Sequence, residues 1–344
     1  MDDTRSGPVH TRMLAVRVEQ RDPTRWGAHG VILDLRKRGL VPMARDLQTS
    51  GVIHHMRVEA LIDVGRAQLV WIRAEQPSVA FEASPGTGGE CCRDPVSRIE
   101  SLAGTALAEF ARNLGAAVGG PRGCSHVQTL ALCVASTAER ALAADRALHG
   151  EARRESGTRI FQRSLSIDGL SAPDGALDLE IQLSDVHCAP TPPDADPFAK
   201  LARHEELRVR ASIDLDTLTL RRLAAAERCT QPGSPEPAWR DRDADVAWLA
   251  GQGAMGGVAR AVLARLRDPK DAPLRDALLN LSPTLVQCIP GISERWRSRA
   301  AAGSPSMFAS GGMVDSCYMW RRGGFLSERI EDELRAFREA KPHG

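Results

Sequence analysis

Hydrophobic and polar residues alternate in two pairs of segments within the first 75 residues of the chain. The first pair covers residues 13–18 and 31–35, and the second covers residues 55–62 and 67–74. Alternation with a period of two predicts β-strands. An Asp/Gly turn at residues 63–66 joins the second pair into a predicted hairpin. We therefore expect four antiparallel strands at the start of the chain.

The spacing of apolar residues then changes to that of a helix. The residues at intervals of three or four, which predict a helix of about four turns, are Ile99, Leu102, Ala106, Phe110 and Leu114. A glycine-rich loop at residues 119–126 follows and leads into a mostly apolar helix predicted at residues 127–142. Near the end of the chain, a glycine-rich strand-and-turn segment is expected at residues 306–325, with a short charged helix at residues 326–340. The first half therefore has the predicted order ββββαα.

Seven residues of the second predicted hairpin recur unchanged 151 positions later. Arg57, Val58, Ala60, Ile62, Asp63, Leu69 and Ala74 correspond to Arg208, Val209, Ala211, Ile213, Asp214, Leu220 and Ala225. This ordered match predicts an internal duplication. We expect an α+β fold of two tandem ββββαα repeats, whose antiparallel sheets pack together or edge to edge and are covered by helices. The first repeat covers residues 1–150, the second covers residues 151–303, and a C-terminal segment at residues 304–344 completes the site.

The two predicted repeats differ in their chemistry. The first carries Gly123-Cys124-Ser125-His126 before its last helix, where the second has Pro273-Leu274-Arg275-Asp276. The first carries His54-His55, where the second has Glu205-Glu206. The candidate site therefore lies in the first repeat, and the second is interpreted as a degenerate copy.

Cys124 and His126 are the leading catalytic candidates. A thiol at the start of a helix lies at the positive end of the helix dipole, which favours the thiolate. Gly120 and Gly123 allow the backbone to approach a ligand closely. His54 and His55 begin a strand and point to opposite faces, so only one of them can face a shared pocket.

A metal site is an alternative use of the same loop. Cys92, Cys124, His126 and Cys317 could form a closed site for zinc or iron, although the chain has no Cys-x2-Cys pair. A metal-free Cys/His pair and a purely structural turn remain the other interpretations. Three further residues are candidates for contacts with a substrate: His10, Arg12 and Asp315. Arg12 could hold a carboxylate or phosphate through two hydrogen bonds, unless it lies on a solvated strand edge.

Composition excludes several classes of protein. Lys+Arg 45 against Asp+Glu 44 leaves a net charge of +1, so no global field attracts nucleic acid or anionic lipid. Aromatic residues are 4% of the chain, too few for base-stacking surfaces. No apolar run approaches the roughly 20 residues of a membrane span, and no secretory signal is recognisable. We expect a cytoplasmic protein whose eight cysteines are mostly thiols.

Five motifs resemble those of a bacterial family known as domain of unknown function 2889. They are His10-Thr-Arg12, Ile53-His54-His55-Met56, Cys92-Arg-Asp-Pro95, the loop at residues 119–126 and Val314-Asp-Ser-Cys-Tyr318. The resemblance covers residues 8 to about 145, and the family more often has Thr in place of Ser125. It favours His54 over His55. It also implies a bacterial origin and a place in the catabolism of aromatic or polycyclic compounds.

The sequence thus predicts a small-molecule enzyme of the lyase, isomerase or hydrolase type. No credible fingerprint of a redox cofactor is present, nor do the usual motifs of phosphate-binding loops, zincin proteases or α/β-hydrolases occur. In this hypothesis Cys317 closes the site of the first repeat. The alternative is a non-enzymatic metal-binding or scaffold protein built as a pseudo-dimer. Self-association into a homo-oligomer is compatible with either.

Overall fold

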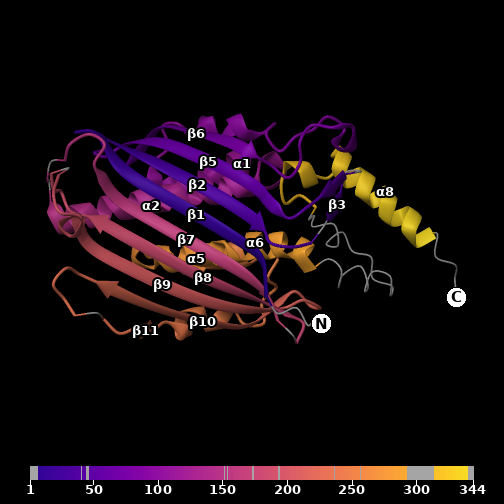
Figure 1. The fold of residues 1–344 in the computed structure, drawn as a ribbon. Coiled ribbons are helices and arrows are strands. Elements are labelled where there is room, and N and C mark those ends of the chain that lie inside the picture. Colours follow the sequence, from indigo (N-terminus) through magenta and orange to yellow (C-terminus); the bar gives the residue numbers. More distant parts are fainter. Residues whose placement is uncertain are drawn as a thin grey trace.

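A nine-stranded antiparallel sheet organises the protein. We analysed a computed structural model, which describes residues 7–39, 41–43, 46–150, 152, 154–172, 174–192, 194–235, 237–255, 257–292 and 314–339. The strand order is β11-β10-β9-β8-β7-β1-β2-β5-β6 (Figure 1). The first half contributes β1 (Gly7–Asp22), β2 (Arg25–Arg36), β5 (Gly51–Asp63) and β6 (Gln68–Ser78). The second half contributes β7 (Arg159–Ser171), β8 (Ala176–Cys188), β9 (Leu201–Asp214), β10 (Thr219–Thr230) and β11 (Arg240–Asp241).

The sequence predicted two sheets packed together or edge to edge, and the structure joins the strands of both halves edge to edge in one continuous sheet. Strands β1 and β7 pair with each other along most of their length, with Leu14 opposite Leu165. This pairing satisfies backbone groups that would otherwise form open edges at β1 and at β7. A separate two-stranded sheet is formed by β3 (Val41–Met43) and β4 (Asp46–Gln48). The predicted hairpins are present, and their strands are longer than the alternating segments indicated.

Helices cover one face of the sheet (Figure 1). The long helix α2 (Ser125–His149) contacts β1, β2, β5 and β7, and α6 (Leu281–Cys288) contacts β1 and β7. The strand residues of this face, such as Val16 and Ile32, are fully buried, whereas Met13 on the other face is 51% exposed. The core therefore lies between the sheet and this single layer of helices. Burying each large apolar side chain there contributes roughly 1.5–3 kcal/mol to stability.

Shorter helices complete the fold. The α-helices are α1 (Phe110–Val118), α3 (Asp243–Val246), α4 (Val258–Arg265), α5 (Ala272–Leu279) and α8 (Phe325–Glu339). The 3-10 helices are η1 (Pro85–Thr87), η2 (Val96–Leu102), η3 (Leu107–Glu109), η4 (Gly120–Arg122), η5 (Pro197–Lys200), η6 (Ala247–Leu249), η7 (Pro269–Asp271), η8 (Ile289–Ile292) and η10 (Tyr318–Trp320). None of the helices in the described part of the chain has the length and apolar content needed to span a membrane.

The helix predicted across residues 99–114 is broken into η2, η3 and α1. Between η2 and η3 the backbone turns to the edge of β6, where Gly104 donates to the Leu69 carbonyl and Leu69 donates to the Thr105 carbonyl. Gly104 adopts φ +79°, a conformation that glycine tolerates better than other residues. These hydrogen bonds to the sheet edge replace the ones that a continuous helix would make.

The C-terminal segment returns to the first half of the chain. The backbone N–H of Tyr318 donates to the carbonyl of Gly123 at 2.8 Å, so η10 lies against the loop at residues 119–126. Helix α8 confirms the predicted terminal helix and extends away from the sheet (Figure 1). Residues 306–313 of the predicted strand-and-turn segment lie outside the described residues. Residues 314–324 form turns and η10, with no strand.

Candidate functional site

Titratable side chains on three neighbouring strands point toward the helices. Alternation places His10 and Arg12 of β1, Asp34 and Arg36 of β2, and His54 of β5 on this face. Arg12 lies opposite Asp34 in the sheet register, and Asp34 lies opposite His54. All five side chains are buried. The register therefore collects a row of charged and imidazole groups at one end of the core.

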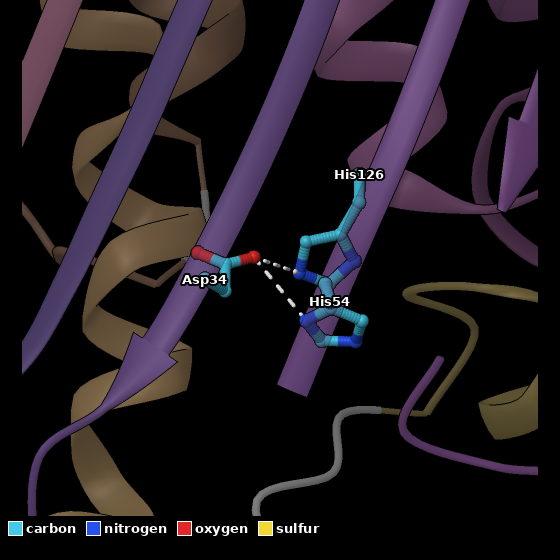
Figure 2. A group of neighbouring side chains, drawn as sticks. All are labelled: Asp34, His54 and His126. Atoms are coloured by element: carbon cyan, nitrogen blue, oxygen red, sulfur yellow. Dashed lines mark hydrogen bonds and ion pairs between the residues drawn. The ribbon is translucent and has the colours of Figure 1, made fainter. Parts of the chain in front are cut away.

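The carboxylate of Asp34 is the centre of this cluster. His54 Nδ1 lies 3.2 Å and His126 Nε2 lies 3.5 Å from Asp34 Oδ2 (Figure 2). His10 Nε2 lies 3.1 Å from Oδ1, the other carboxylate oxygen, and Arg12 Nη1 lies 3.7 Å from it. The rings of His54 and His126 are close together, with centroids 3.9 Å apart. One carboxylate thus contacts three imidazoles and a guanidinium.

The surroundings set the charge of these groups. Burial alone would raise the pKa of Asp34, but Arg12 and the surrounding imidazoles hold that pKa well below its ordinary value. Burial lowers the pKa of His10, and burial together with His54 lowers the pKa of His126 well below its ordinary value. At neutral pH the cluster therefore contains an ionised carboxylate beside neutral His10 and His126 rings.

The glycine-rich loop places His126 over the sheet. A Cβ on Gly123 would lie 2.3 Å from the carbonyl oxygen of Val118, so only glycine fits at this close approach. Helix α2 begins immediately after, and its first turn carries His126 toward Asp34. Gln287 of α6 approaches the same ring nitrogen that faces Asp34, with its Nε2 atom 3.2 Å from His126 Nε2.

A pocket opens beside the cluster and brings together most of the predicted site residues. His54, Cys92, Gly123, Cys124, His126 and Cys317 all line it. The remaining wall is mostly apolar and includes Ile53, Phe81, Val286, Pro290, Met319 and Trp320. Segments nearly 200 residues apart in the sequence, the loop at residues 119–126 and η10, thus meet at one pocket.

Four predicted residues do not line this pocket. His10 and Arg12 are fully buried behind Asp34, so they do not occupy a solvated strand edge. Gly120, with φ +56°, and Asp315 line a neighbouring groove, which also reaches His126. The Asp315 carboxylate accepts a hydrogen bond from the backbone N–H of Arg322 at 2.9 Å, an interaction within its own turn.

The thiols differ from the expectation based on the helix dipole. Cys124 precedes the first residue of α2, but burial raises its pKa to about 12. Burial also raises the pKa values of Cys92 and Cys317. The Cys124 sulfur lies 4.0 Å from His126 Nδ1 and 3.5 Å from Gln76 Nε2. Desolvation exceeds the dipole effect here, so these cysteines are protonated thiols in the protein without a bound ion.

Potential metal ligands gather in a different set from the one predicted. Asp34, His54 and His126 each offer an atom, and these atoms all lie within 4.8 Å of one another. Among the described residues, no group containing Cys92, Cys124 or Cys317 meets this criterion. His126 belongs to both sets, while the cysteines line the pocket around it.

Sequence reasoning missed Asp34, Arg36, Gln76 and Gln287. The strand at residues 31–35 was recognised, and its alternation contains a usable signal. Ile32, Asp34 and Arg36 share one phase, so a buried Ile32 places both charged residues in the core. Gln76 and Gln287 carry no comparable signal, because their approach to Cys124 and His126 depends on tertiary packing.

Comparison with protein families gives one match. Residues 10–140 match the model of a family described as "Protein of unknown function (DUF2889)". The matched segment runs from β1 into α2 and contains Asp34, His54 and His126, whereas Gln287 and Cys317 lie beyond it. A search of curated proteins found no match.

Proposed function

We propose that the protein is a metal-dependent enzyme acting on a small molecule, with Asp34, His54 and His126 as ligands of a zinc or iron ion. The observation that supports this most directly is the convergence of three buried ligand atoms within 4.8 Å beside a pocket. Two imidazoles and one carboxylate are a common ligand set for catalytic zinc and for non-haem iron. The reaction belongs to the hydrolase, lyase or isomerase type.

The separations between the ligand atoms suit a shared ion. Bonds of roughly 2.0–2.1 Å to nitrogen and oxygen in a tetrahedral site place two ligand atoms about 3.3 Å apart. Asp34 Oδ2 lies 3.2 Å from His54 Nδ1 and 3.5 Å from His126 Nε2. The side chains therefore need little rearrangement to bind an ion, beyond loss of the ring proton that forms a hydrogen bond with Asp34.

Neighbouring residues prepare these ligands. Arg12 stabilises the Asp34 carboxylate as an anion, and a low pKa keeps the His126 ring neutral, which are the protonation states that ligands require. His10 binds the second carboxylate oxygen and so orients the Asp34 carboxylate. Partners of this kind fix the geometry of a metal site. A bound ion would supply Lewis-acid polarisation of a substrate oxygen or activation of a water molecule.

The metal content of protein purified without an affinity tag or chelator tests the proposal. Plasma mass spectrometry should find about one zinc or iron per chain, and His54→Ala should remove it. His55→Ala is the matched control, because this neighbouring ring lies on the opposite face of β5. Cys124→Ala and Cys317→Ala should retain the metal. A wild-type protein that stays metal-free after incubation with Zn²⁺ and with Fe²⁺ would contradict the proposal.

A cobalt-substituted protein distinguishes an enzyme from a non-enzymatic metal carrier. Three protein ligands leave a coordination position open, as catalytic sites require, whereas a structural site is closed by four. Azide should therefore change the visible spectrum of the Co²⁺ protein. An unchanged spectrum at saturating azide would favour the carrier.

A metal-free acid–base site is the second candidate. The ion pair and hydrogen bond between Asp34 and His54 resemble the way a carboxylate orients a general-base imidazole. This alternative needs no ion and uses the same pocket. It is favoured if the protein binds no metal and His54→Ala still abolishes turnover.

An internal duplication is part of the proposal. Arg12 and Asp34 are opposite each other in the sheet, and so are Arg163 and Asp185, 151 positions later. Asp34 lies opposite His54, and Asp185 lies opposite Glu205 at the same offset. This shared register supports descent of both meanders from one ancestral unit, of which the first has kept the ligand set.

A further inference from the structure

Arg36 is a buried cation that the protein leaves without its full complement of hydrogen bonds. It is the last residue of β2, two positions after Asp34, and only 3% of its surface is exposed. Its Nε and Nη1 atoms have no hydrogen-bond partner in the described part of the chain. A guanidinium is charged at neutral pH. An uncompensated buried charge costs several kcal/mol.

Arg36 lines the same pocket as His54 and His126. Arg36 therefore forms part of the wall that a bound molecule would contact, whereas Arg12 lies behind Asp34 and outside the lining. A guanidinium presents two parallel N–H groups that match the two oxygens of a carboxylate. An anionic ligand at this position would supply the hydrogen bonds and the countercharge that the protein lacks.

We propose that the pocket binds a substrate that carries a carboxylate on an apolar body, with the carboxylate paired to Arg36 and the reacting group at Asp34, His54 and His126. The carboxylate is favoured over a phosphate because the lining offers one guanidinium among mostly apolar groups, and a phosphate dianion would need more donors. Phe81 and Trp320, in edge-to-face contact at 5.8 Å, supply an apolar wall for the body. The location of the reacting group rests on the proposed function, but the anion contact does not.

Binding of two probes of equal shape tests this inference. Phenylacetate and phenylacetamide differ in charge at the same position, so their dissociation constants isolate the ionic contact. Both are measured by isothermal titration calorimetry with metal-free full-length protein. Wild-type protein should bind phenylacetate at least about tenfold more tightly than the amide. Arg36→Gln should abolish this preference and leave binding of the amide within about twofold of wild type.

Arg57→Gln is the control. It removes the same charge from β5, on the solvent-facing side of the strand that carries His54, and should keep the preference for phenylacetate. Equal binding of the two probes by wild-type protein would overturn the inference. So would a preference that survives in Arg36→Gln, or failure of both probes to bind.

The outcomes separate this inference from the proposed function. The metal content of His54→Ala tests only the proposed metal site. The binding of the two probes is measured in metal-free protein and tests only the anion contact. A metal-binding protein with no preference for phenylacetate would contradict the substrate class and leave the metal site intact. A metal-free protein that discriminates between the probes through Arg36 would support the substrate class and contradict the metal site.

Discussion

The two halves of the sheet each bury an arginine opposite an aspartate, yet they use the pair differently. In the second half, Arg163 Nε and Nη2 donate to the two oxygens of Asp185 at 2.7 and 2.6 Å, and Nη1 donates to Asp276. In the first half, Arg12 lies 3.7 Å from Asp34, and its three guanidinium nitrogens have no hydrogen-bond partner among the described residues.

The neighbours of each aspartate explain the difference. Asp185 is accompanied by Glu205 and Asp276, and this group of three carboxylates is paired with three arginines, Arg140, Arg163 and Arg203. In the first half, imidazoles occupy the corresponding positions, and they share Asp34 with the arginine. An ion pair in which the arginine and the carboxylates bind each other fully stabilises the fold, whereas the Asp34 carboxylate, shared among imidazoles and one distant guanidinium, would keep lone pairs for the proposed ion. The same backbone register thus supports a structural pair and a chemical site.

The largest expected change in stability comes from removing the arginine that pairs with Asp185 and Asp276. Arg163→Met should lower the free energy of unfolding by about 3–5 kcal/mol, because it leaves Asp185 and Asp276 buried without a countercharge. Arg12→Met should cost less, since it removes a single long ion pair. Urea unfolding followed by circular dichroism measures both. A larger loss for Arg12→Met than for Arg163→Met would show that the two sites were assigned the wrong roles.

The second-half cluster should also make stability depend on acid. Burial would raise the pKa of Glu205, but His187 and Arg140 lower it from 4.5 to about 2. A folded-state pKa below the unfolded one contributes stability above pH 4.5, and this contribution is lost as the pH falls toward 2. The difference corresponds to roughly 3 kcal/mol as an upper value.

Comparison with Glu205→Gln measures this effect. Between pH 5 and pH 2, wild-type protein should lose more unfolding free energy than the variant, and urea unfolding across this range gives the difference. If the unfolding free energies of the two proteins fall equally with pH, Glu205 is not held as an anion by its partners.

The smallest expected effect is a gain in the free energy of unfolding rather than a loss. Arg36→Met removes an unsatisfied buried charge from the first-half pocket and should raise the unfolding free energy by about 1–2 kcal/mol. Such a gain would identify Arg36 as a residue whose charge costs stability. Destabilisation comparable with that of Arg163→Met would instead place Arg36 among the structural ion pairs. Thermal unfolding of both variants under identical conditions makes the comparison direct.

Local patterns predicted much of the fold. Period-two alternation found the hairpins, and the apolar run after residue 126 found α2, because both signals are intrinsic to the element. The pairing of β1 with β7 carries no such signal, since any alternating strand can add to any open edge. The helix predicted across residues 99–114 failed where Gly104 bonds to β6, an interaction between distant segments.

The candidate site was predicted in part. The sequence motifs identified the loop at residues 119–126, His54 and Cys317 as parts of the site, and residues of all three line one pocket. Asp34 is a charged residue on the buried side of an alternating strand, and alternation alone does not show which of the two sides is buried. The acidity of Cys124 could not be judged from its place before a helix, because the raised pKa comes from the surrounding core.

The hydrogen bond from Tyr318 to Gly123 also has a consequence for biosynthesis. The ribosome makes His126 and the strands beneath it long before it makes residues 316–320, which form one wall of the pocket. During translation of the second half, the thiols and the imidazoles of the first half therefore face solvent or a chaperone on that side. If the proposed ion binds there, this order of assembly would give it access to Asp34, His54 and His126 before the last wall closes over them.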